Sequence, residues 1–117
     1  MLTVFAAVTL AAQPIAPPQA EPILTPPQAA ALRCGVVFAL GAKLQEEKSL
    51  FAADWPPLGT RGKEYFVRVI ARLMDDTKAS RETLSAMAMR QVPALGDPKA
   101  TAAAMPGCLP LLDASGL

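Results

Sequence analysis

A chain of 117 residues corresponds to one domain. Lys and Arg total 11 against 10 Asp and Glu, so the net charge of +1 offers no basic footprint for nucleic acid. Apolar residues make up 52 % of the chain, much of it alanine, and aromatics only 5 %. This composition favours helix over strand and predicts an all-α fold.

The N-terminal region has the pattern of a secretory signal. An apolar run of eleven residues, Leu2 to Ala12, is followed by small residues suited to cleavage. The run is shorter than the about 20 residues that a spanning helix needs, so no stable membrane span is expected in the mature chain. No Lys or Arg precedes Arg33. The alternative is therefore an apolar N-terminal helix that stays attached.

These features divide the chain into three parts. Residues 1–20 are expected to be a signal peptide and processing region, and residues 21–24 the remnant of a Pro-rich linker. Residues 25–117 are expected to form a single helical domain. Export places the mature protein in the periplasm or outside the cell.

The first expected helix has a clear start and an unusually apolar body. Thr25 is a good N-cap, Pro26 suits the first helical position, and Gln28 completes a capping box. Residues 34–42 contain no charge, which predicts a central, buried helix. Gly35 and Gly41 would permit close packing with a neighbouring helix.

A loop with the single tryptophan follows. Trp55 precedes Pro56 and Pro57, which break any helix. Phe51 and Trp55 are candidate contacts for a ligand or a protein partner. The alternative, which we favour for Trp55, is that it fixes the loop over the core.

The segment 61–77 predicts an amphipathic helix. Its apolar face is expected to carry Phe66, Val69, Ile70, Leu73 and Met74, with Tyr65 at the edge. The opposite face carries arginines interrupted by Glu64 and Asp75, as in a solvated surface. An acidic partner or lipid headgroups are the alternative contacts for these arginines.

Two further helices are expected. Ser80 can cap a helix over residues 81–92, which Pro93 should end or kink. Asp97 and Pro98 form a start signal for the last helix. Its apolar stripe continues past two prolines, Pro106 and Pro110, so a kinked helix is expected with the following inner residues: Met105, Cys108, Leu109 and Leu112.

The two cysteines are expected to pair. Cys34 lies in the most apolar helix and Cys108 on the inner stripe of the last one. In an exported protein, two such cysteines form a disulfide. The sequence therefore predicts an all-α bundle of about four helices linked by one Cys34–Cys108 disulfide. Two unrelated buried thiols are the alternative if the chain stays in the cytosol.

Residues for catalysis are scarce. The chain has no histidine, which removes the commonest general base and zinc ligand. The cysteines are too far apart for a redox pair, and the glycines of "GTRGKEY" lack the ending of a phosphate-binding loop. We expect no catalytic residue, metal site or cofactor, and no enzyme.

Three stretches, "LRCGVVFAL", "RGKEYFVRVIARLMDD" and "MPGCLPLLDA", resemble small exported helical proteins of Ala-rich bacterial proteomes. That resemblance implies one disulfide and no particular activity. The expected architecture is also similar to that of the acid-stress periplasmic chaperones of the HdeA type, without their motifs.

The expected function is a non-catalytic protein-interaction or structural module of the bacterial cell envelope, with a protein partner that the sequence does not identify. The alternatives are a carrier of a small apolar ligand held between helices near Phe51, Trp55 and the Met residues, or a small periplasmic chaperone-like protein.

Overall fold

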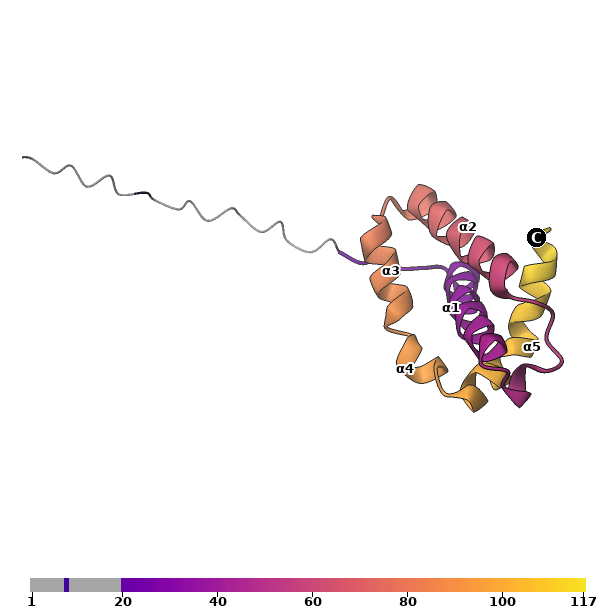
Figure 1. The fold of residues 1–117 in the computed structure, drawn as a ribbon. Helices are drawn as coiled ribbons and strands as arrows, with labels where there is room; N and C mark the ends of the chain where they lie inside the picture. Colours follow the sequence, from indigo (N-terminus) through magenta and orange to yellow (C-terminus); the bar gives the residue numbers. More distant parts are fainter. Residues whose placement is uncertain (1–7, 9–19) are drawn as a thin grey trace, which may run out of the picture.

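The computed structural model describes Val8 and residues 20–117, and every regular element in this part of the chain is helical. In chain order the elements are α1 (Pro26–Glu46), the 3-10 turn η1 (Leu50–Ala52), α2 (Gly59–Thr77), α3 (Arg81–Met89), α4 (Val92–Leu95) and α5 (Pro98–Ala114) (Figure 1). The predicted all-α fold is confirmed. The signal peptide assigned to residues 1–20 lies outside the described residues, apart from Val8 and Ala20, and stays a prediction.

Helix α1 begins with the predicted capping box. The backbone N–H of Gln28 donates to the Thr25 hydroxyl at 3.3 Å, and the N–H of Thr25 donates to the Gln28 side-chain oxygen at 3.0 Å. Two of the N–H groups that a helix start leaves without partners are thereby satisfied.

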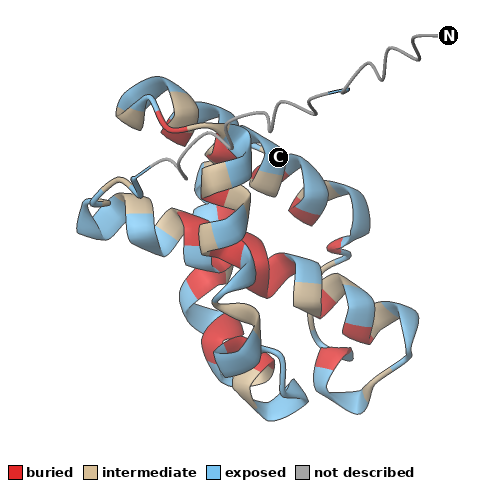
Figure 2. Ribbon diagram, turned by 90° about the vertical axis from the view of Figure 1, so that its left-hand side faces the viewer, coloured by how far each residue is buried: buried red, intermediate tan, exposed pale blue. Residues whose placement is uncertain are grey.

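The centre of the fold is α1, which packs against η1, α2, α3, α4 and α5 (Figure 1). Five consecutive residues of this helix, 34–38, are buried, because neighbours cover it on several sides. The buried positions gather where the helices face one another (Figure 2). The prediction of a central helix that is apolar all round is therefore confirmed.

Close packing at glycines brings α1 against its neighbours. A β-carbon at Gly35 would lie 2.7 Å from the Phe66 ring, and one at Gly41 would lie 2.6 Å from Cε of Met105. Both glycines therefore permit the close packing that the sequence indicated, and a larger residue at either position would require a neighbouring side chain to shift. Gly62 of α2 similarly lies against Phe38, 3.0 Å from its Cβ when a β-carbon is built.

Helix α2 begins at Gly59, two residues before the predicted start. Its buried face also differs from the prediction, because Tyr65 lies in the core and not at the edge. The Tyr65 ring meets Phe38 edge to face at 4.9 Å, and its hydroxyl donates to the carbonyl of Ala31 at 3.4 Å. The close approach at Gly62 turns this side of α2 toward α1, which buries a residue three positions further on.

The helices after α2 follow their capping signals. Ser80 accepts from the N–H of Thr83, and Asp97 accepts from the N–H of Lys99 at 2.9 Å. The helix expected over residues 81–92 is shorter, because α3 ends at Met89 and Pro93 falls in the first turn of the separate helix α4. Proline fits a first turn because the N–H that it lacks has no partner there.

Helix α5 contains both prolines of its predicted pattern. Pro106 and Pro110 lie inside one continuous helix with exposed side chains, while Met105, Cys108 and Leu112 are almost fully buried. Each proline removes a backbone N–H from the helix, which is the physical basis of the predicted kink. The inner stripe continues past both prolines, as predicted.

Candidate functional site

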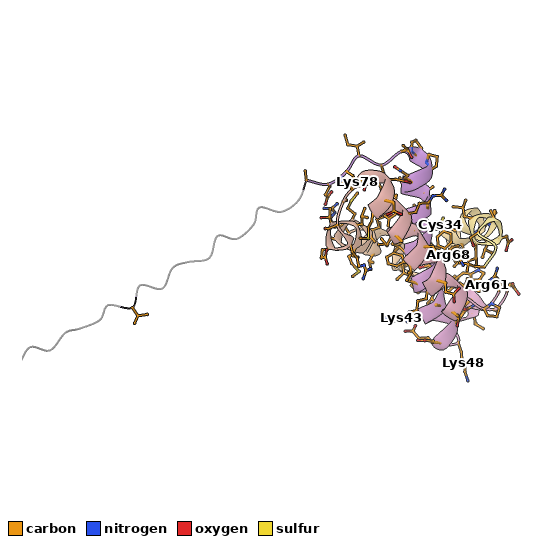
Figure 3. The ribbon with its side chains drawn as sticks, turned by 90° about the horizontal axis from the view of Figure 1, so that it is seen from above. Cys34, Lys43, Lys48, Arg61, Arg68 and Lys78 are labelled. Atoms are coloured by element: carbon orange, nitrogen blue, oxygen red, sulfur yellow. A yellow bond between two sulfur atoms is a disulfide. The ribbon has the colours of Figure 1, made fainter. Side chains whose placement is uncertain are left out.

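The Cys34–Cys108 disulfide joins α1 to α5. The two Cα atoms lie 5.2 Å apart, and both residues are buried in the core. The first and last helices are therefore neighbours, as the predicted pairing requires. Figure 3 shows Cys34 in the interior of the bundle. A buried bridge of this kind has a structural role.

The loop between α1 and α2 is held by one side chain, Gln45. Its amide nitrogen donates to the carbonyl of Pro56 at 2.8 Å and, more weakly, to that of Trp55 at 3.5 Å. Its amide oxygen accepts from the backbone N–H of Leu58 at 2.9 Å. A single residue of α1 thus fixes the backbone of the Pro-Pro segment.

Trp55 is half-buried and packs against the core. The edge of its ring approaches Gly41 of α1, where a built β-carbon would lie 3.5 Å from Cζ3. This placement agrees with the expectation that Trp55 fixes the loop over the core. Its role as a ligand or partner contact stays a prediction.

Leu50 and Phe51 form the exposed tip of this loop. Leu50 is 92 % exposed and Phe51 is 47 % exposed. Ser49 caps the 3-10 turn by accepting from the N–H of Phe51 at 3.3 Å, and the next residue, Ala52, is buried. We call Leu50 and Phe51 the apolar tip. It is an apolar projection on a loop whose backbone is fixed at both ends.

A shallow apolar groove lies between α2 and α3. Its volume is about 210 Å³, and the residues that line it are Phe66, Val67, Ile70, Ala71, Met74, Arg81 and Ser85. Val67 is 59 % exposed there, although it lies in the middle of α2. Arg81 is the only charged lining residue, and within the described part of the chain its guanidinium makes no ion pair or hydrogen bond. We call this feature the α2–α3 groove.

The arginine face of α2 is partly occupied by the end of the chain. Arg61 donates to the backbone carbonyl of Leu117 at 2.9 Å and lies 3.6 Å from the carboxylate of Asp113. Arg68 donates to the carbonyl of Ser115 at 3.5 Å. The arginine face of α2 is therefore not solvated throughout, because Arg61 and Arg68 hold the segment after α5.

Among the described residues, three titratable groups have a shifted pKa. Burial raises the pKa of the Tyr65 phenol, because the core disfavours the phenolate. On the surface, Glu21 and Arg90 form an ion pair. Its hydrogen bond lowers the pKa of Glu21 and raises that of Arg90. Glu21 belongs to the predicted linker remnant, which is thus attached to the end of α3.

The described residues contain no cluster of His, Cys, Asp or Glu that could hold a metal ion. No helix among them is long and apolar enough to cross a membrane. Comparison with family models, curated protein sequences and solved structures found no match.

Sequence patterns indicated Phe51 and Trp55 as candidate contacts. They did not indicate a contact role for the other residues of the loop and of the α2–α3 groove that the structure brings forward, namely Leu50, Gln45, Val67 and Arg81. For Leu50 a signal existed, because the Leu-Phe pair directly follows a polar segment, residues 45–49, and precedes the helix-breaking Pro56 and Pro57, so no long periodic pattern would bury it.

Proposed function

We propose that this protein is an exported, non-catalytic interaction module of the bacterial cell envelope, and that the apolar tip is its contact surface for another protein. The observation that carries the proposal is the tip itself. Leu50 and Phe51 are exposed on a loop whose conformation the Gln45 hydrogen bonds and the Trp55 contact fix in advance.

Such a projection suits protein recognition for two reasons. Large exposed apolar side chains gain free energy when a partner covers them. A loop that is already ordered loses little conformational entropy on binding, so more of that gain appears as affinity. The partner expected from this chemistry is a protein with an apolar depression.

Export is supported by the disulfide, because disulfides persist in oxidising compartments outside the cytosol. N-terminal sequencing of the protein recovered from the periplasm or medium tests this part. The mature chain should begin between Ala12 and Glu21. Recovery of intact Met1 from the cytosol would overturn export.

A cross-linking experiment in envelope extract tests the contact surface. The double variant Leu50→Ser/Phe51→Ser should lose a cross-linked species that the wild-type protein forms. The matched control, Ile23→Ser/Met89→Ser, removes two exposed apolar side chains elsewhere and should retain that species. Equal cross-linking of all three proteins would show that the tip is not the contact surface.

A further inference from the structure

The apolar tip lies at one end of the bundle, and the α2–α3 groove extends from the middle of α2 toward the other end. The tip follows α1, beside Lys48, whereas the groove runs toward the end of α2, beside Lys78. Figure 3 shows Lys48 and Lys78 at opposite ends of the bundle. A tip therefore cannot occupy the groove of its own molecule, but it can reach that of another copy.

The two features share an apolar character. The tip consists of exposed apolar residues and the groove is a hollow lined mainly by apolar residues, with Leu50 92 % and Val67 59 % exposed. The groove volume of about 210 Å³ is below the range of about 300–1,000 Å³ that encloses a small-molecule ligand. It therefore suits the side chains of a protein projection better than a whole ligand.

The charged residues around the two features differ in balance. Glu46, Glu47 and Asp54 are exposed beside the tip, against two exposed cations, Lys43 and Lys48, so acidic groups are in slight excess there. The groove contains one charged lining residue, Arg81, which has no partner within the described residues.

The side chains offer further favourable contacts. An aromatic ring in the groove would meet the thioether of Met74 and the guanidinium of Arg81, both of which are favourable neighbours for aromatic faces and edges.

We propose that the apolar tip of one molecule docks in the α2–α3 groove of a second copy of this chain. The inference rests on the proposed function, in that it names the protein partner of the same tip. After such a contact the pair keeps one free groove, on the molecule whose tip is bound, and one free tip, on the molecule whose groove is filled. The association is therefore heterologous, and it builds head-to-tail chains or closed rings.

A contact through one tip is small, so the association is weak, with a dissociation constant on the order of 0.1–1 mM. Nuclear magnetic resonance of the full chain at decreasing concentration measures it. Backbone amide signals of residues 49–52 and of the groove should shift together between about 2 mM and 20 μM. The rest of the bundle should show little change.

A mixing experiment separates the two halves of the contact. Leu50→Ser/Phe51→Ser removes the tip, and Val67→Asp places a charge in the groove at an exposed helical position. Neither variant should show concentration-dependent shifts alone. The isotope-labelled tip variant is then mixed with the unlabelled groove variant. In this mixture the only possible contact is between the intact groove of the labelled protein and the intact tip of the unlabelled protein. Groove signals of the labelled protein should then shift.

With the labels reversed, only the tip signals of the labelled groove variant should shift. In a separate variant, Arg81→Glu should weaken the self-association of the chain at least threefold. The control Ile23→Ser/Met89→Ser should associate like the wild-type protein. Absence of concentration-dependent shifts up to 2 mM would overturn the self-docking proposal. So would shifts that persist in the tip variant, or groove signals that move only with a co-purified apolar ligand.

These results are distinguishable from failure of the proposed function. If the wild-type chain does not self-associate but the tip variant still loses its cross-linked species in envelope extract, the tip binds a different protein. Self-docking is then wrong, while the tip remains the contact surface.

Discussion

Removal of the Cys34–Cys108 disulfide should strongly destabilise the helical domain. The bridge connects residues 74 positions apart in the sequence. In the chain-entropy treatment, closing a loop of that length stabilises the folded state by about 4.5 kcal/mol at 25 °C. This is an upper value, because a reduced unfolded chain retains residual structure and engineered bridges deliver less. Domains of this size have a net stability of about 5–15 kcal/mol, so the bridge supplies a large share of it.

The variants Cys34→Ala and Cys108→Ala, and the double variant, measure this contribution. Alanine avoids placing an unpaired hydroxyl in the core, where both sulfur atoms lie. For a domain of 60–100 residues, each kcal/mol lowers Tm by about 4–8 °C. We expect each single variant to melt about 15–30 °C below the oxidised wild-type protein.

The comparison of single and double variants identifies the cause. Both single variants lose the same bond. The free energy of unfolding of the double variant should therefore be at most about 1 kcal/mol below that of the less stable single variant. Mass spectrometry without reductant should find the wild-type protein two mass units lighter than its reduced form and resistant to alkylation. Two freely alkylated thiols in exported protein, or equal Tm values with and without reductant, would refute the reasoning.

Three further changes test particular contacts. Trp55→Ala should lower the free energy of unfolding by about 2–3 kcal/mol in urea, because the ring packs against the core; an unchanged value would favour a binding role. Lys78→Gly should raise Tm by a few degrees, because Lys78 ends α2 at a φ of 62°, where glycine has no steric penalty; a lower Tm would contradict this. Burial raises the pKa of Tyr65 above its unfolded value, so the stabilisation from the neutral phenol is complete below pH about 10 and is lost as pH rises through the folded pKa. Between pH 9 and 12, the urea midpoint of Tyr65→Phe should therefore fall less steeply with pH than that of the wild-type protein. An equal slope in both proteins would show that Tyr65 does not cause the loss of stability at high pH.

Local signals in the sequence predicted the helices well. Thr25, Ser80 and Asp97 each cap a helix where their side chains indicated a start. These signals are reliable because a cap satisfies backbone groups within a few residues of itself. The disulfide was also predictable, because only two cysteines exist and both lie on apolar helical stripes.

The contacts that shape the candidate surfaces could not be predicted in this way. Gln45 bonds to backbone 10 to 13 positions away, and Arg61 bonds to a carbonyl 56 positions away. Nothing within either residue's own neighbourhood specifies such a partner, since it depends on how the helices pack. The burial of Tyr65 has the same origin, because the close approach of α2 at Gly62 sets which of its side chains reach Phe38.

The positions of the disulfide and the apolar tip connect stability to the proposed function. The 3-10 turn that carries the tip packs on both α1 and α5, the two helices that the disulfide joins. Met105 of α5 and Trp55 of the loop both approach Gly41, so the base of the loop depends on the spacing of these helices. If reduction of the bridge allows α5 to move away from α1, the base of the loop loses its α5 contacts before the whole domain unfolds. The tip then keeps its side chains but loses its fixed conformation, and binding through it must again meet the entropic cost of ordering the loop.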